Sequence, residues 1–110
     1  IDNNYISDDI YYNGIMMSVF QTINYSIDLM DFFLIIKKQK VSKYRELPEK
    51  LFDLKIIDEN TRDCLEELIS YRNIVAHEYH HISKEDLNHL LEIISCVEIL
   101  TEKIEIEINK

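Results

Sequence analysis

The residues best suited to chemistry lie in one short stretch of the chain, which reads RNIVAHEY. An α-helix turns by about 100° per residue, so a helix here places Arg72 and Tyr79 almost directly above one another. Asn73 and His77 then form an i, i+4 pair on the neighbouring strip, with the small side chain of Ala76 between the strips. One side of such a helix presents a guanidinium, an amide, an imidazole and a phenol, and leaves room for another helix to approach.

These groups suffice to cleave RNA without a metal ion. His77 can take the proton from a ribose 2′-hydroxyl, which then attacks its own phosphate. Arg72 offers a planar fork for phosphate oxygens and stabilises the charge on the pentacoordinate phosphorus. An acid must also protonate the leaving 5′-oxygen, and a two-fold dimer would bring a second histidine and arginine into the same cleft. From residue chemistry alone, a surface arginine and a helix-capping histidine are the alternative.

Apolar residues spaced alternately by three and four predict the helices that must hold this stretch. Polar residues predict where three of these helices begin: Ser42 and Asp58 are expected N-caps, and Ser83 with Asp86 is an expected capping box. Pro48 is expected either near the first turn of the second helix or at a break that it forces, and Gly14 is expected to break or kink the start of the first helix. The four expected helices run from about Asp8 to Lys40, Ser42 to Lys55, Asp58 to Tyr79 and Ser83 to Ile108. The two long seams are Met16, Phe20, Ile23, Ile27, Met30 and Leu34, then Leu87, Leu90, Ile94, Val97, Thr101, Ile104 and Ile108.

The composition favours the same architecture. The 110 residues include one Gly and one Pro, which are too few for the turns of a sandwich or barrel. The fold class predicted is therefore all-α, an up-and-down helical bundle of about four helices. A bundle of this size is marginally stable alone, so we expect a two-fold dimer.

Other features exclude several classes of protein. Cys64 and Cys96 are far apart and outside any CxxC spacing, so we expect reduced, buried thiols in a cytoplasmic protein. The longest apolar run is Phe32 to Ile36, and we expect neither a membrane-spanning helix nor a signal peptide. No cofactor is indicated.

The motif Arg72-x-x-x-x-His77-x-Tyr79 resembles the R-x4-H-x-Y signature of the HepT-like toxins of the HEPN superfamily. The chain before the motif helix is also similar to the family: it contains YREL from Tyr44, LF from Leu51 and IID from Ile56. The segment SIDL from Ser26 resembles the acidic patch of the family's earlier helix. The similarity extends from about Tyr12 to Ile108.

This resemblance implies a metal-independent endoribonuclease that acts as a homodimer with a composite cleft. It also implies a nucleotidyltransferase antitoxin that transfers AMP to Tyr79. Arg72 and His77 then correspond to the catalytic residues, Asn73 to an orienting residue and Asp28 to a supporting one. An adenylyl group beside Arg72 and His77 would fill the cleft and place a phosphate against the guanidinium.

The chain departs from the family at its N-terminus. Many members have a further amphipathic helix before the segment that starts here near Tyr11, where this chain has only ten residues. The chain is therefore either truncated or a short variant. We expect residues 1–110 to form a single domain of the family that lacks this N-terminal helix.

Two alternatives from other classes stay open. The residues His77, Glu78 and His81 also spell HExxH, in which two histidines bind zinc and the glutamate acts as a general base. A helix end between Tyr79 and Ser83 would spoil that ligand geometry, and no clear third ligand follows. The other alternative is a non-catalytic module that keeps the fold and works by binding a nucleotidyltransferase.

The net charge of −9 argues against a protein that binds nucleic acid over its whole surface, but the charge is unevenly distributed. Residues 1–36 carry five acids and no base, whereas residues 37–55 carry seven bases and three acids. The basic segment either guides an RNA backbone toward the cleft or stabilises the C-terminal end of the first helix. Its candidate RNA-backbone contacts are Lys37, Lys38, Lys40, Lys43 and Arg45.

Overall fold

The computed structural model describes residues 3–77 and 82–110, with side chains from residue 10 onward. Within these ranges the chain is helical and contains no strand, which confirms the predicted all-α class. The described helices are α1 (Asn3–Ile36), the 3₁₀ turn η1 (Tyr44–Glu46), α2 (Leu47–Asp53), α3 (Glu59–Ser70), α4 (Arg72–His77), α5 (Lys84–Ile93) and α6 (Cys96–Ile108).

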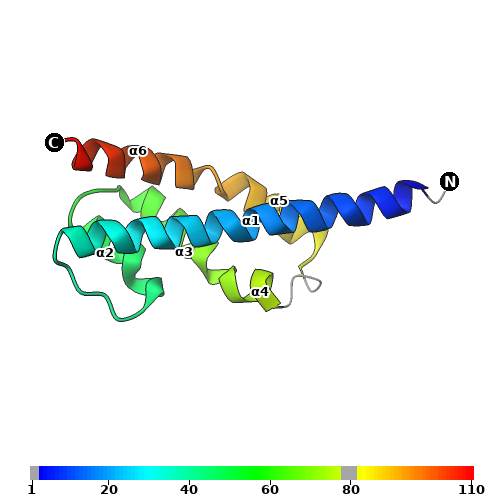
Figure 1. Cartoon of the computed structure of the whole chain (residues 1–110), viewed down its shortest axis with the longest axis horizontal. Helices are drawn as coiled ribbons and strands as arrows, with labels where there is room; N and C mark the ends of the chain where they lie inside the picture. The colour runs from blue at the N-terminus through cyan, green and yellow to red at the C-terminus, as the bar shows by residue number, and fades with distance from the viewer. Residues whose placement is uncertain (1–2, 78–81) are drawn as a thin grey trace.

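Helix α1 runs along the whole length of an elongated bundle, whose extents are 56 × 25 × 21 Å (Figure 1). The shorter helices α2, α3 and α4 follow one side of it, and α5 and α6 follow the other. All five of these helices contact α1. Helix α4, which carries Arg72, Asn73 and His77, is therefore positioned against one continuous helix.

The buried face of α1 is the predicted seam. Met16, Ile23, Met30 and Leu34 are buried, and the remaining two members of the seam are half-buried. The expected kink at Gly14 is wrong, because α1 continues through it and an added Cβ would meet nothing within 4 Å. The helical segment from residue 10 to residue 36 is long and apolar enough to cross a membrane, with a mean hydropathy of 1.3. Since their buried face packs against the other helices, we interpret α1 as the core helix of the bundle.

Three of the four predicted helix-start signals are confirmed. Asp58 Oδ1 accepts a hydrogen bond from the Thr61 backbone N–H at 2.8 Å, and the Ser83 hydroxyl accepts one from Asp86 N–H at 3.0 Å. Pro48 lies in the first turn of α2. The prediction for Ser42 is wrong, because the chain enters η1 through Lys43 and no side chain caps that turn.

The last two predicted helices are each divided. The helix expected to extend to Tyr79 ends at Ser70, and α4 begins after Tyr71 in a new direction. The helix expected from Ser83 is interrupted between Ile93 and Cys96. There the thiol of Cys64 donates to the Ile93 carbonyl at 3.2 Å, the oxygen that Val97 N–H would use in a continuous α-helix.

Both cysteines are free thiols, as expected. Cys64 is half-buried and Cys96 is buried. Burial raises the pKa of the Cys96 thiol well above its ordinary value, with Cys64 as a neighbouring cause. Cys96 is therefore a protonated, apolar member of the core.

Candidate active site

Arg72 is fixed by three neighbours from different elements. It is half-buried at the start of α4, and its Nε donates to Asn24 Oδ1 on α1 at 3.1 Å. Its Nη1 donates to Asn73 Oδ1 at 3.3 Å, and its guanidinium carbon lies 5.7 Å from the centre of the Tyr44 ring. These contacts hold the guanidinium plane in one orientation without neutralising its charge.

The polar partners of Arg72 are both neutral amides. Among the described residues, no carboxylate forms an ion pair with Arg72, and its Nη2 has no hydrogen-bond partner. Within the described residues, this guanidinium therefore has no ionic partner and has Nη2 as a donor for an incoming anion. A phosphate oxygen is the anion that this planar donor fits.

His77 and Asn73 lie one helical turn apart at the two ends of α4. Both are exposed, and they form the i, i+4 pair predicted from the sequence. Asn73 also accepts a hydrogen bond from Arg72, so it links the arginine to the helical strip that carries His77. The structure thus brings Arg72, Asn73 and His77 together on one short helix.

Of the other predicted site residues, Asp28 is not brought into this group, and several lie outside the described residues. Asp28 is exposed on α1 and forms no ion pair with Arg72 in the described part of the chain, so its supporting role stays a prediction. Tyr79 lies outside the described residues. So do Glu78 and His81, and the HExxH alternative therefore also stays a prediction.

The sequence analysis missed Asn24. Its signal was a polar residue in the middle of the apolar first helix, exactly one turn before the acidic residue Asp28. Without knowing that α4 crosses α1 at this level, neither residue stands out as the partner of Arg72. Tyr44 was noted only in the YREL segment of the family resemblance, and its contact with Arg72 joins two regions that are 28 positions apart in sequence.

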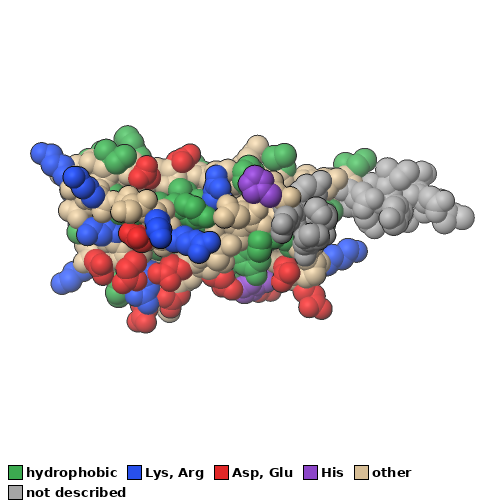
Figure 2. All heavy atoms as spheres, turned by 90° about the horizontal axis from the view of Figure 1, so that it is seen from below, with side chains coloured by type: hydrophobic (Ala, Val, Ile, Leu, Met, Phe, Trp, Pro, Cys, Tyr) green, Lys and Arg blue, Asp and Glu red, His purple; other side chains and the backbone are tan. Residues whose placement is uncertain are grey.

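The part of the basic segment around Tyr44 lies beside this group. Tyr44, which contacts Arg72, sits between Lys43 and Arg45 in the connection from α1 to α2. Figure 2 views the molecule from the side of α4, and lysine and arginine side chains share this face with histidine side chains, while most of the acidic side chains lie toward the lower edge. The five candidate contacts are all exposed: Lys37, Lys38, Lys40, Lys43 and Arg45.

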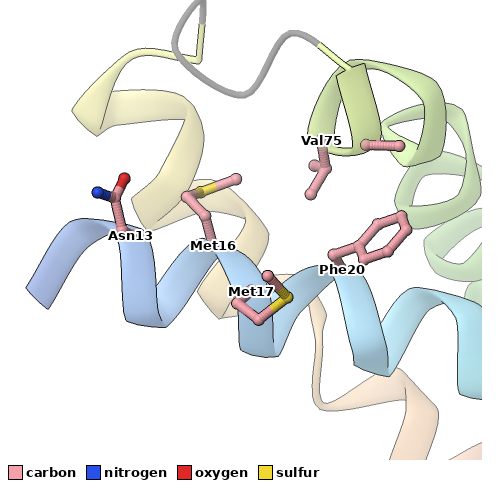
Figure 3. Close-up of a pocket in the computed structure, with 6 residues that line it drawn as sticks. Asn13, Met16, Met17, Phe20 and Val75 are labelled. Carbon is pink, nitrogen blue, oxygen red and sulfur yellow. The ribbon is translucent and has the colours of Figure 1, made fainter. Parts of the chain in front are cut away.

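A pocket of about 280 Å³ opens between α1 and α4 on the same side of α4 as Arg72 (Figure 3). Because Arg72 meets Asn24 while the later residues of α4 meet earlier residues of α1, the two helices run antiparallel here. The pocket is lined by Asn13, Met16, Met17, Phe20, Val75 and Ala76.

Comparison with protein families gives a match over residues 2–104 to the family described as "Ribonuclease HepT-like". The chain belongs to this family. The match covers nearly all of the described helices, including α4 with Arg72 and His77, and it confirms the resemblance seen in the sequence. The comparison with curated proteins gave no match, and neither did the comparison with solved structures.

Proposed function

We propose that this HepT-like protein is the toxin of a HEPN/nucleotidyltransferase pair and acts in the cytoplasm as a metal-independent endoribonuclease. The observation that carries the proposal is the pairing on α4 of an oriented, unneutralised Arg72 with an exposed His77. Membership of a family described as ribonucleases supports the same reaction class.

The reaction is a transfer of the RNA phosphate to the neighbouring 2′-oxygen. His77 removes the 2′-hydroxyl proton while that oxygen bonds to phosphorus, and Arg72 stabilises the negative charge that develops there. The bond from phosphorus to the 5′-oxygen breaks, and the leaving oxygen takes a proton from the partner subunit's His77. The products are a 2′,3′-cyclic phosphate and a 5′-hydroxyl end, and no water or metal ion is consumed.

A homodimer is proposed because one chain supplies only one His77. The side of α1 that faces away from the core supports this proposal, since large apolar side chains are exposed along it. Tyr25, Phe32 and Ile35 have exposed fractions of 49 %, 56 % and 63 %. Contiguous exposed apolar surface of this kind marks protein contacts.

The test is cleavage of single-stranded RNA in excess chelator. We expect cleavage by the parent protein and a loss of about 10²- to 10³-fold in kcat for Arg72→Ala and for His77→Ala. His89→Ala is the matched control, because His89 is an exposed histidine on α5 that pairs with Glu67. Equal cleavage by all four proteins would reject catalysis at this site and favour the non-catalytic module. Cleavage that strictly requires zinc would instead favour the alternative of an HExxH zinc hydrolase.

Mixed dimers test whether the site is composite. A dimer of one parent chain and one His77→Ala chain retains one His77, whereas the proposed transfer uses His77 of both subunits. We expect the activity of this mixed dimer to fall far below half that of the parent dimer. About half the parent activity, in a preparation shown to contain mixed dimers, would place each complete site within one chain.

Neutralisation by AMP transfer is tested on Tyr79. We expect incubation with the cognate nucleotidyltransferase and ATP to add the mass of AMP to this tyrosine and to abolish RNA cleavage. Tyr79→Phe is the control that should stay unmodified and active. Modification of the Tyr79→Phe variant to the same extent would show that another residue is the acceptor.

A further inference from the structure

The pocket between α1 and α4 has an apolar interior and a single polar end. Met16 and Val75 are almost completely buried, and Phe20 is half-buried beside them. Figure 3 shows the side chains of these three residues converging on the space between the two helices, with the amide of Asn13 at the far end along α1. Met17, which is 57 % exposed, lies on the same stretch of α1 and lines the remaining wall.

The pocket lies next to the candidate active site along α4. Val75 and Ala76 follow Arg72 by three and four residues, which places all three on the same side of α4. The rise of an α-helix separates Arg72 from Ala76 by about 6 Å along the axis. His77 directly follows Ala76, so the pocket lies between the level of the guanidinium and the level of the imidazole.

The size and lining of the pocket fit one flat, ring-shaped group. Its volume of about 280 Å³ is just below the range of roughly 300–1,000 Å³ that is usual for drug-sized ligands. An aromatic ring and thioether sulfurs make favourable contacts with a planar aromatic ligand, and an amide can bond to the polar edge of such a ligand. Unpaired RNA bases are recognised by this combination of stacking and edge hydrogen bonds.

We propose that this pocket is a nucleobase subsite, which holds one unpaired base of the RNA next to the phosphate bound by Arg72. The inference rests on the proposed ribonuclease function and deepens it, because it assigns a substrate contact that selects single-stranded RNA. Phe20 and Met16 contact the faces of the base, and Asn13 bonds to its edge. A base seated here fixes the position of its own ribose and phosphate relative to His77 and Arg72.

The test measures binding separately from cleavage. The probe is a short single-stranded RNA with 2′-O-methyl groups, which lack the attacking hydroxyl, and a series of copies that each lack one base. We expect one position at which loss of the base weakens binding to the parent protein by about tenfold, the effect of losing one stacked base. Phe20→Leu should remove this sensitivity, because it deletes the ring and keeps most of the apolar volume.

The matched control is Phe52→Leu, the same change at a half-buried ring of α2 that packs against Arg62. This variant should keep the full base sensitivity. Asn13→Ala is a second variant on an exposed residue, expected to fold normally and to weaken binding at the same position by a smaller factor. The decision rests on Asn13→Ala if circular dichroism shows that Phe20→Leu is unfolded.

Three results would overturn the subsite. The first result is that removal of no single base weakens binding of the RNA to the parent protein. The second is that one base position remains sensitive in both Phe20→Leu and Asn13→Ala. The third is a pocket that binds free AMP while bases of the RNA have no effect, which would assign it to the adenylyl group instead. Failure of the proposed function gives a different result: base-dependent binding to 2′-O-methyl RNA persists, but unmodified RNA is not cleaved.

Discussion

Arg62 and Arg72 are both half-buried arginines that lie over an aromatic ring, but their polar partners differ. The guanidinium of Arg62 lies 4.5 Å from the ring centre of Phe52, and that of Arg72 lies 5.7 Å from the ring centre of Tyr44. Hydrogen bonding to Asp63 raises the pKa of Arg62, and nearby carboxylates add to the effect. Four carboxylates pair with Arg62: Glu49, Glu59, Asp63 and Glu66, at 3.3, 3.6, 2.9 and 3.9 Å.

The two histidines of the described chain show the same contrast. His89 Nε2 lies 2.7 Å from Glu67 Oε2, whereas His77 forms no ion pair with a described carboxylate. Arg62 and His89 therefore lie against carboxylates, whereas Arg72 and His77 have no carboxylate partner among the described residues. Since both pairs use the same residue types, the difference in their partners, not in composition, distinguishes a structural cluster from a candidate site.

The largest effect is expected from removing each arginine in turn. Arg72→Met should lower kcat for RNA cleavage by about 10²- to 10³-fold and leave the Tm nearly unchanged. Arg62→Met should lower the Tm, because its four carboxylates lose their shared partner, and leave kcat per folded molecule nearly unchanged. Steady-state kinetics and thermal unfolding measure the two quantities, and equal losses of kcat in both variants would remove the functional contrast.

A second prediction concerns a variant in which Arg72 gains a carboxylate partner, as Arg62 has. Asn24→Asp places a carboxylate against the Nε of Arg72, where the parent has an amide at 3.1 Å. The new ion pair should weaken RNA binding by about tenfold and reduce the slope of log affinity against log salt by about one. Titrations at several salt concentrations measure both quantities.

The control for this change is Gln21→Glu, which adds the same charge to an exposed position on α1. We expect a smaller loss of affinity, because Gln21 is not the hydrogen-bond partner of Arg72. If both variants weaken RNA binding equally, the overall charge of α1 matters and the direct contact does not.

The features that depend on local sequence pattern were predicted correctly. Helical spacing predicted the buried seam of α1 and the i, i+4 pair of Asn73 and His77. Hydrogen bonding within one segment predicted the caps at Asp58 and Ser83. Family resemblance then indicated which of the two histidines of the described chain belongs to the site.

The remaining features depend on contacts between distant segments. The division at Tyr71 has no Gly or Pro to signal it, and it allows α3 and α4 to pack on different parts of the bundle. The division after Ile93 involves a thiol from α3, 29 positions earlier in the chain. The hydrogen bond between Arg72 and Asn24 likewise joins residues that are 48 positions apart. It could be predicted only by knowing that α4 crosses α1 at this level.

A third prediction concerns the basic segment beside Arg72. Lys43→Ala removes an exposed cation next to Tyr44 and should weaken binding of all single-stranded RNAs a few-fold, with a salt slope smaller by about one. Lys103→Ala, on α6, is the matched control and should leave affinity unchanged. A loss that depends on RNA sequence would contradict a backbone contact at Lys43.

The smallest effect is expected at the neutralised histidine. The hydrogen bond that His89 donates to the Glu67 carboxylate raises the pKa of His89, so the folded protein holds this proton more tightly than the unfolded chain does. The resulting stabilisation is complete below the unfolded value of about 6.5 and is lost as the pH rises through the raised pKa of the folded state. Both side chains are substantially exposed, so the change in Tm should be slight.

Glu67→Gln removes the carboxylate and should flatten this decline of Tm with pH. Glu66→Gln makes the same change at the preceding residue of α3, whose carboxylate pairs with Arg62, and should keep the decline. Thermal unfolding of the three proteins across neutral pH measures the difference. An identical pH dependence in Glu67→Gln and the parent would show that His89 is not neutralised by this pair, and the contrast with α4 would then rest on Arg62 alone.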